Sequence, residues 1–319
     1  MKAFVKDRYG PPDVMRMAEL DKPEPTAEQV LVRLDASSVN AYDWHMLRGK
    51  PYLARLGEGL RTPKTRVLGL DVAGVVEGVG TNVTHVKPGD RVYGSRSGAF
   101  AEYVAGQSMV AMPENLSFEQ AAAVPTAGQT ALQGLRDHGA LESGQRVLVN
   151  GAGGGVGSFA VQIAMAMGAE VTAVTNPRSV EVVRSLGAEH VIDYTRDDFT
   201  SGGGRYDLIF DAGGRTPLSR MRRALTPTGR IVLVAPAPGD WIGPIVRIVG
   251  AKLMSRLGRN HVGSYLATAG RPDLLELTQL IEAGKVTPVL DRTYPFDQTP
   301  EAIRHVESGG PSGKVVITF

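Results

Sequence analysis

The chain has 319 residues, enough for two packed domains at roughly 100–200 residues each. Its 35 lysines and arginines nearly balance 33 aspartates and glutamates, and a formal charge of +2 argues against a nucleic-acid-binding protein. The absence of cysteine excludes disulfides, thiolate nucleophiles and thiolate-ligated zinc. The first residues (MKAFVKDRYG) have no apolar core of signal-peptide length, so we expect a cytoplasmic protein.

The first 120 residues are rich in predicted strands. Gln29–Leu34 and Val72–Val79 have strand-like composition, and glycine, proline and asparagine turns separate such runs. Lys87–Asp90 (KPGD) is a turn signature that leads into a further strand at Arg91–Tyr93. This part of the chain therefore predicts a β-rich domain.

Beyond about Ser117 the apolar period lengthens and strands alternate with helices. Strands are predicted at Gly144–Asn150, Glu170–Thr175, His190–Asp193, Tyr206–Asp211, Ile231–Ala235 and, at the end, Lys314–Phe319. Helices are predicted at Gly155–Met167, with Val156, Ala160, Ile163 and Met167 on one face, and at Pro177–Leu186, Leu218–Leu225 and Arg271–Ala283. This alternation predicts an α/β fold, a Rossmann-type doubly wound parallel sheet covered on both faces.

A glycine-rich loop, Gly151–Gly157 (GAGGGVG), follows the first of these strands and begins a helix. Small residues let the backbone approach a pyrophosphate, and the helix N-terminus offers free amides and a positive dipole end. The loop residues that we expect to bind the dinucleotide are Ala152, Gly154 and Gly157, at the three fingerprint positions, with Gly155 and Val156 between them. The alternative is a loop that serves only close helix–strand packing.

The residues at the end of the next predicted strand indicate whether the cofactor is NAD or NADP. An NAD enzyme usually carries an acidic residue there, which holds the ribose 2′-hydroxyl. This chain instead has Thr175, Asn176 and Ser179 as neutral hydrogen-bonding groups and Arg178 as a cation for a 2′-phosphate. The segment therefore predicts NADPH, although Arg178 could also be an exposed residue of a first helical turn.

These motifs together resemble the medium-chain dehydrogenase/reductase superfamily, and within it the zinc-free quinone oxidoreductase branch. The resemblance covers nearly the whole chain and rests on Val39–Asp43, Gly69–Val76, Lys87–Val92, Gly98–Tyr103, Ala121–Pro125, the glycine loop and Gly313–Ile317. It implies a GroES-like β-barrel substrate domain at residues 1–122 and 264–319 and a Rossmann NADPH-binding domain at 123–263. It also implies an active-site cleft between the domains and a homodimer.

The resemblance implies further cofactor contacts. Thr130 would approach the nicotinamide ribose or ring, and Lys314 would belong to a phosphate-facing tail segment. The residues expected along the adenosine and phosphate side are Tyr194, Asp211, Ala212 and Gly213, and those expected near the nicotinamide are Ala235 and Pro236.

A metal is not expected. Zinc-binding relatives place a cysteine in the first motif and a His-Glu pair where this chain has Leu70-Asp71, and the six histidines show no paired spacing. Without a Lewis acid, acceptors that take hydride readily fit better, namely small lipophilic quinones or α,β-unsaturated ketones and aldehydes. The alternatives are a zinc-independent NADP-dependent alcohol or aldehyde dehydrogenase and a non-catalytic NADPH-binding protein.

Four residues are candidates for the chemistry. Asn40 is expected to orient the substrate oxygen or the nicotinamide, and Tyr52 to donate to the developing enolate or hydroquinone oxygen. His45 stands where a tyrosine is expected in the quinone reductases and is a second donor, while Asp43 would fix His45 or the local backbone. Alternatively, Asn40 and Asp43 only cap a helical turn at Tyr42–Arg48 and Tyr52 is a packing residue, so the proton donor stays open.

One apolar segment, Trp241–Leu257, has basic residues interspersed along it. As a helix it would form a lid over a lipophilic substrate, lie at a membrane surface, or pack in the core or a dimer contact. Apolar stripes are usually packing surfaces, so we expect the last of these.

Overall fold

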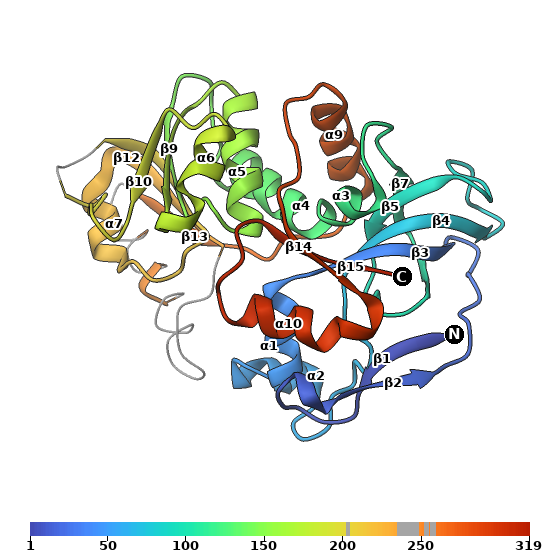
Figure 1. Cartoon of the computed structure of the whole chain (residues 1–319). Helices are drawn as coiled ribbons and strands as arrows, with labels where there is room; N and C mark the ends of the chain where they lie inside the picture. Colours follow the sequence, from blue (N-terminus) through green and yellow to red (C-terminus); the bar gives the residue numbers. More distant parts are fainter. Residues whose placement is uncertain (202–204, 235–248, 252–254, 256–259) are drawn as a thin grey trace. The chain divides into compact units, whose positions relative to one another are not determined.

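The computed structural model describes residues 1–201, 205–234, 249–251, 255 and 260–319. The chain forms two compact units (Figure 1): Met1–Ala127 with Ala269–Glu282 and Pro288–Phe319, and Gly128–Thr268 with Ala283–Thr287. The boundary falls within helix α4 (Pro125–Gln133). Two short segments predicted in the first domain, 264–268 and 283–287, thus belong to the second unit, and residues 123–127 belong to the first.

Glutamine side chains explain where those two segments lie. The Gln133 amide donates to Thr268 O (2.7 Å) and accepts from Thr268 N (3.0 Å). The Gln162 amide pairs in the same two ways with Thr287, at 3.0 and 2.8 Å. Each pairing satisfies a backbone donor and acceptor that have no strand partner, and sequence periodicity carries no sign of it.

The first unit is built on a seven-stranded sheet. Six of its strands follow in the order β14 (Leu290–Pro295), β15 (Lys314–Thr318), β3 (Val30–Val39), β4 (Asp71–Val79), β5 (Arg91–Ser95) and β7 (Ser108–Ala111), while β6 (Tyr103–Gly106) also pairs with β3. Only β14 and β15 pair in parallel. A separate hairpin joins β1 (Lys2–Lys6) and β2 (Met15–Glu19). The apolar interior includes Val32, Val72 and Val92.

Helices surround that sheet. They are α1 (Ala41–Arg48), α2 (Arg55–Glu58), α3 (Phe118–Ala122), α9 (Arg271–Glu282) and α10 (Thr299–Glu307). Helices α1 and α10 lie side by side (Figure 1), and Arg48 makes two hydrogen bonds to the Glu307 carboxylate, at 2.7 and 2.9 Å. Leu47 and Ile303 pack in one core cluster, so α1 is held firmly beside its neighbour.

The second unit contains a six-stranded parallel sheet. Its order is β10 (His190–Asp193), β9 (Glu170–Thr175), β8 (Arg146–Asn150), β11 (Tyr206–Asp211), β12 (Leu225–Leu233) and β13 (His261–Ser264). In sequence order this is 3-2-1-4-5-6, the order of a doubly wound Rossmann sheet, so the predicted fold class is confirmed. Its helices include α5 (Gly155–Ala166), α6 (Val180–Ser185) and α7 (Leu218–Ala224).

Some predicted elements differ in detail. Helix α5 is buried on more than the face predicted from its apolar residues, because every residue from Gly157 to Ala164 is buried. The predicted helix Pro177–Leu186 divides into a 3₁₀ turn, Pro177–Ser179, and α6. Ala235 and Pro236 lie outside the described residues, as does most of Trp241–Leu257. Among the helices that are described, none combines the length and apolar character needed to cross a membrane.

Candidate functional site

In the second unit, the ends of three neighbouring strands meet at the glycine loop. The backbone N–H groups of Gly151 and Ala152 both donate to Val174 O at the end of β9 (3.0 Å each). A Cβ at Gly151 would lie 2.9 Å from Gly213 N, just beyond β11. The loop, β9 and β11 therefore converge at the carboxyl edge of the sheet, where ligands of open α/β folds bind.

Helix α5 begins in this loop with Gly154 as its N-cap. No side chain caps it, and the N–H groups of its first turn, at Gly155, Val156 and Gly157, have no partner within the helix. Twelve residues of aligned peptide dipoles add positive potential at that end. The arrangement suits a diphosphate.

The glycines of the loop serve different purposes. A Cβ at Gly153 would overlap Ser179, and one at Gly157 would overlap the Gly151 carbonyl oxygen, so these two are needed for packing. At Gly154, φ is −84° and an added Cβ would meet nothing nearer than 3.4 Å, at Gly151 O. Neither conformation nor packing requires glycine there. The open approach fits a dinucleotide phosphate group close to the backbone.

The segment predicted to select NADPH follows β9. Asn176 caps the 3₁₀ turn by accepting from Ser179 N (3.1 Å) and Ser179 Oγ (3.3 Å), and Thr175 and Ser179 are buried beside Gly153. These neutral groups therefore also shape the loop. Arg178 is exposed, as a residue that binds a 2′-phosphate must be.

The end of β11 is held by a buried carboxylate. Asp211 Oδ1 accepts from Asn150 Nδ2 (2.7 Å) and Gly214 N (3.2 Å), while Ala212 N donates to Asn150 O (2.9 Å). Asp211 thus joins the ends of β8 and β11. Tyr194 N donates to Thr175 O (3.2 Å), and this residue is 58% exposed at the same edge.

In the first unit, four polar residues form a buried cluster. Lys314 Nζ donates to Asn40 Oδ1 (2.6 Å) and lies 3.3 Å from Asp71 Oδ2. Asn40 Nδ2 donates to the same Asp71 oxygen (2.8 Å), and Ser38 Oγ donates to it at 2.5 Å. The other Asp71 oxygen accepts from Thr126 N (2.7 Å). A buried cation and anion are thereby paired around the Asn40 amide.

The structure places Lys314 in this cluster. Its ammonium group is 3% exposed and its hydrogen bonds go to Asn40, Asp71 and Val39 O, while a phosphate contact of its segment stays a prediction. Register explains this position, because Val315 pairs with Val39 and brings the start of β15 next to Asn40. Asp71 was missed, although a lone acid inside the apolar run Leu68–Val76 must be paired if that run is buried.

Asp43 has a backbone role. Its Oδ2 accepts from Asn40 N (2.7 Å) and its Oδ1 from Gly69 N (3.0 Å), so it fixes the start of α1 and the strand entrance at Gly69. Burial raises the pKa of Asp43 to about 7, although these two backbone hydrogen bonds oppose the shift. Of the two roles expected, holding the local backbone is the one that these contacts support.

The two candidate proton donors lie near the end of α1. The Nδ1 atom of His45 is 3.1 Å from Lys50 O, and its ring stacks on Trp44 with centroids 3.5 Å apart. If Nδ1 donates to that carbonyl, Nε2 can donate only in the imidazolium form. The Tyr52 ring lies 4.7 Å from the Arg55 guanidinium, and that guanidinium also donates to Gly49 O (2.9 Å).

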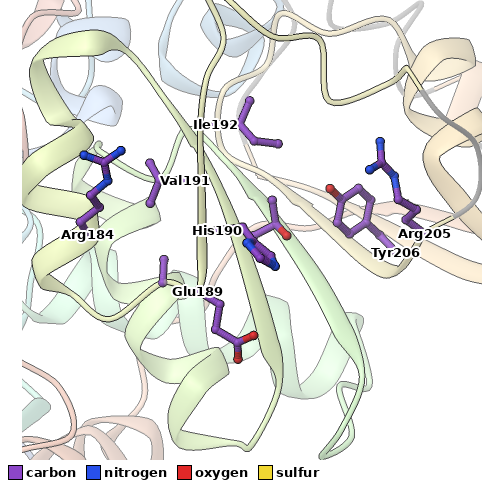
Figure 2. Close-up of a pocket in the computed structure, with 9 residues that line it drawn as sticks. Arg184, Glu189, His190, Val191, Ile192, Arg205 and Tyr206 are labelled. Carbon is purple, nitrogen blue, oxygen red and sulfur yellow. The ribbon is translucent and has the colours of Figure 1, made fainter.

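Thr130 lies in α4, where its carbonyl accepts from the Tyr265 hydroxyl. A pocket of about 620 Å³ (Figure 2) lies elsewhere in the same unit, lined by Thr172, Arg184, Ala188, Glu189, His190, Val191, Ile192, Arg205 and Tyr206. His190 and Tyr206 are the first residues of β10 and β11, so this pocket is at the amino edge of the sheet. None of the predicted cofactor residues lines it.

Comparison with known proteins agrees with this geometry. The family model of the alcohol dehydrogenase GroES-like domain matches residues 26–116, and the model described as zinc-binding dehydrogenase matches 186–317. The mitochondrial NAD(P)H oxidoreductase RTN4IP1 of Mus musculus is 33% identical, covering 99% of this chain and 89% of the relative. The 2-methylene-furan-3-one reductase of Solanum lycopersicum is also 33% identical, with 99% and 79% covered. The chain belongs to the quinone oxidoreductase branch of the medium-chain dehydrogenase/reductase superfamily.

Solved structures of this superfamily share the fold over the whole length. The quinone oxidoreductase from Coxiella burnetii has a TM-score of 0.85 and 29% identity, covering 100% of this chain and 99% of that one. The Escherichia coli quinone oxidoreductase complexed with NADPH has a TM-score of 0.84 and 25% identity, with both chains covered completely. The predicted fold class, a Rossmann-type parallel sheet together with a GroES-like domain, is therefore confirmed.

One of the two family models is described as zinc-binding dehydrogenase. This chain has no cysteine, and it has Leu70-Asp71 at the position where the resemblance implies a His-Glu pair in zinc-binding relatives. In the parts of the chain that the structure describes, no three His, Asp or Glu side chains are grouped to hold a metal ion. Lys314 supplies the buried positive charge beside Asp71 instead.

Proposed function

We propose that this protein transfers hydride from NADPH to a small lipophilic quinone or α,β-unsaturated carbonyl compound. The observation that carries the proposal is the start of α5, where uncapped amides and the open approach at Gly154 fit a dinucleotide diphosphate. The similarity to a quinone oxidoreductase complexed with NADPH and to a 2-methylene-furan-3-one reductase supports both the cofactor and the class of acceptor.

The residues toward the adenosine end give the preference for NADPH. No carboxylate stands at Thr175–Ser179 to repel a 2′-phosphate, and Arg178 is exposed there. Its guanidinium offers charge-assisted hydrogen bonds to phosphate oxygens, in a fork geometry that a 2′-hydroxyl cannot use.

When bound, the nicotinamide supplies a hydride. The acceptor takes that hydride at carbon, or at a quinone oxygen, and its conjugated oxygen gains negative charge until a proton neutralises it. Asn40 is suited to stabilise that oxygen, because its amide donates without titrating. Lys314 donates to Asn40 Oδ1 and so polarises the amide, which strengthens the N–H groups on Nδ2 as donors.

One Nδ2 hydrogen of Asn40 is engaged by Asp71 at 2.8 Å. The other makes only a long contact, 3.5 Å, with Ser38 O, and this is the hydrogen that we assign to the acceptor oxygen. The proton then comes from Tyr52 or His45. Tyr52 needs no prior protonation to donate, whereas the Nδ1 contact of His45 with Lys50 O leaves it a donor at Nε2 only as imidazolium.

The oligomeric state, the localisation and the partners are proposed from the same family resemblance. We propose a homodimer that acts in the cytoplasm on small molecules, without nucleic acid and without a membrane-bound step. Light scattering on the purified chain measures the oligomeric state, and a mass of 33.9 kDa would show a monomer and refute the dimer.

The test of the function is steady-state oxidation of NADPH and NADH with a panel of quinones, enones, enals, ketones and aldehydes. We expect turnover with the first three classes, and NADPH favoured over NADH by about 10–100-fold, the worth of one or two charge-assisted hydrogen bonds. Activity confined to ketones or aldehydes would indicate a dehydrogenase, and cofactor binding without any turnover a non-catalytic protein.

Arg178→Ala should abolish most of the NADPH preference. Arg184→Ala is its matched control, because Arg184 lies on the next helix with its guanidinium already paired to Glu181 at 2.6 Å. An unchanged preference in Arg178→Ala would show that Arg178 does not bind the 2′-phosphate. The proposed hydride transfer from NADPH would not be affected by that result.

A further inference from the structure

Helix α4, which carries Thr130, does not continue as a regular α-helix. It passes directly into a π-helical turn at Gly134–His138, where Gly139 N donates to Gly134 O, five residues back, at 2.8 Å. The helix ends with this turn, because Gly139 and Ala140 that follow are not helical. Turns of this kind occur at helix C-termini.

The hydroxyl group of Tyr265 lies against the helix just before this turn. It donates to Thr130 O, and a Cβ built on Gly134 would overlap it. The Tyr265 hydroxyl therefore lies beside both Thr130 and Gly134. A side chain that bonds a helix carbonyl in this way sets the local course of the helix.

Gly134 makes room for this hydroxyl. A Cβ at this position would overlap the Tyr265 hydroxyl and would lie 2.5 Å from Phe210 Cε2. Its φ is not in the left-handed region, so the reason for glycine is space and not backbone conformation. Glycine at position 134 therefore leaves the space that the Tyr265 hydroxyl occupies.

Tyr265 is itself held in place. Its ring stacks on His138 with centroids 4.2 Å apart and planes inclined by 20°. Three residues on, Thr268 pairs with the Gln133 amide at 2.7 and 3.0 Å, so the whole segment after β13 runs along α4. Burial raises the pKa of Tyr265, which keeps the hydroxyl protonated as a donor across the physiological range.

We propose that Tyr265 is a positioning residue for Thr130. By donating to the Thr130 carbonyl, its hydroxyl fixes the place and direction of Thr130 on α4, and with it the contact of Thr130 with the nicotinamide end of NADPH. This inference rests on the proposed function, because Thr130 has that contact only if the dinucleotide binds as proposed.

The test compares Tyr265→Phe, Thr130→Val and the double variant. The readouts are the dissociation constant for NADPH and the emission of bound NADPH, which reports the surroundings of the nicotinamide and not just affinity. We expect Tyr265→Phe to weaken binding about tenfold, the effect of one hydrogen bond, and to shift the emission. In the Thr130→Val background the same change should add almost nothing, because both variants remove one interaction.

Tyr93→Phe is the matched control. It also deletes a buried tyrosine hydroxyl, which bonds Leu274 O (2.8 Å) and Thr278 (2.9 Å) within the first unit, and it should leave the NADPH emission unchanged. Normal emission and affinity in Tyr265→Phe, or effects that simply add in the double variant, would overturn the role of Tyr265.

A second measurement on the wild-type protein does not depend on the variants folding. Coupling between sites is reciprocal, so NADPH should slow hydrogen exchange of the Gly134 amide at least several-fold. Exchange at Gly134 that is the same with and without bound NADPH would contradict the inference. A wild-type protein with no affinity for NADPH would instead refute the proposed function itself, and the inference with it.

Discussion

At the scale of single residues, the Asn40 amide is the group on which the proposed chemistry depends most. Replacing it with alanine removes the polarised donor while Lys314 and Asp71 keep their ion pair at 3.3 Å. We expect Asn40→Ala to lower kcat by about 10²–10³-fold, as loss of one oxyanion donor does, and to leave NADPH affinity within about twofold, since the diphosphate contacts are elsewhere.

Ser37→Ala is the control for that variant. Ser37 is also buried and its hydroxyl donates to the Asp71 backbone carbonyl (2.7 Å), so it belongs to the same neighbourhood without a hydrogen bond to the amide of Asn40. Stopped-flow and steady-state rates with one quinone and one enone measure both variants. Turnover at the wild-type rate in Asn40→Ala would show that Asn40 only shapes the start of α1.

Asp43 gives a prediction about stability and pH. Its folded-state pKa of about 7 lies above the ordinary 3.8, so between these values the native state holds a proton that the unfolded chain has lost. The stabilisation is complete below the ordinary pKa and is lost as the pH rises through about 7, with a slope of up to about 1.4 kcal/mol per pH unit.

Urea unfolding of wild type and Asp43→Asn between pH 5 and 7.5 isolates this contribution. The asparagine variant keeps the volume and cannot titrate, so the wild-type free energy of unfolding should fall with pH relative to it. Lys6, whose pKa burial lowers to about 8, titrates above this range. Parallel curves for the two proteins would mean that Asp43 is ionised throughout.

At the scale of elements, two glycines at the start of α5 have different roles, one in packing and one in the proposed binding of the diphosphate. A methyl group at Gly157 would overlap the Gly151 backbone oxygen, so Gly157→Ala should destabilise the protein by about 1–3 kcal/mol through overpacking. A methyl group at Gly154 meets only ordinary contact distances within the protein. Gly154→Ala should therefore fold normally and bind NADPH at least tenfold more weakly.

Chemical unfolding and NADPH fluorescence titration, run on both variants, distinguish these two effects. Stability lost in Gly154→Ala would assign that glycine to packing, like its neighbours. Unchanged NADPH affinity in a stable Gly154→Ala protein would instead count against a diphosphate at this helix N-terminus.

The elements that could be predicted are those whose signals are local. The glycine loop, with a buried strand before it and a helix after it, specifies β8 and α5 within some 20 residues of sequence. The hydrogen bond of the Tyr265 hydroxyl to Thr130 O could not be predicted, because the two residues are 135 apart in the sequence. The hydrogen bond of Lys314 to Asn40 could not be predicted for a similar reason, since these residues are 274 apart and only the register of β15 on β3 joins them.

At the scale of the whole molecule, the chain returns to its first unit after completing the Rossmann sheet. Residues 1–127 provide most of the barrel strands, yet β14 and β15 come from the last 30 residues, and Lys314 arrives with them. The cluster around Asn40 is therefore assembled from the two ends of the sequence. Composition and periodicity predict that there are two units, but only the pairing of β15 with β3 brings the final residues to the site.

The whole chain also allows a prediction about metal. It has no cysteine, Leu70-Asp71 replaces the His-Glu pair, and Lys314 pairs with Asp71, so a tightly bound zinc ion has no thiolate to hold it. Dialysis against a strong chelator, followed by metal analysis, should leave less than stoichiometric zinc and an unchanged kcat for quinone and enone reduction. The matched control is a zinc-dependent alcohol dehydrogenase treated alongside. Activity that falls with the chelator and returns with added zinc would contradict the account, because the acceptor oxygen would then be stabilised by an ion and not by the Asn40 amide.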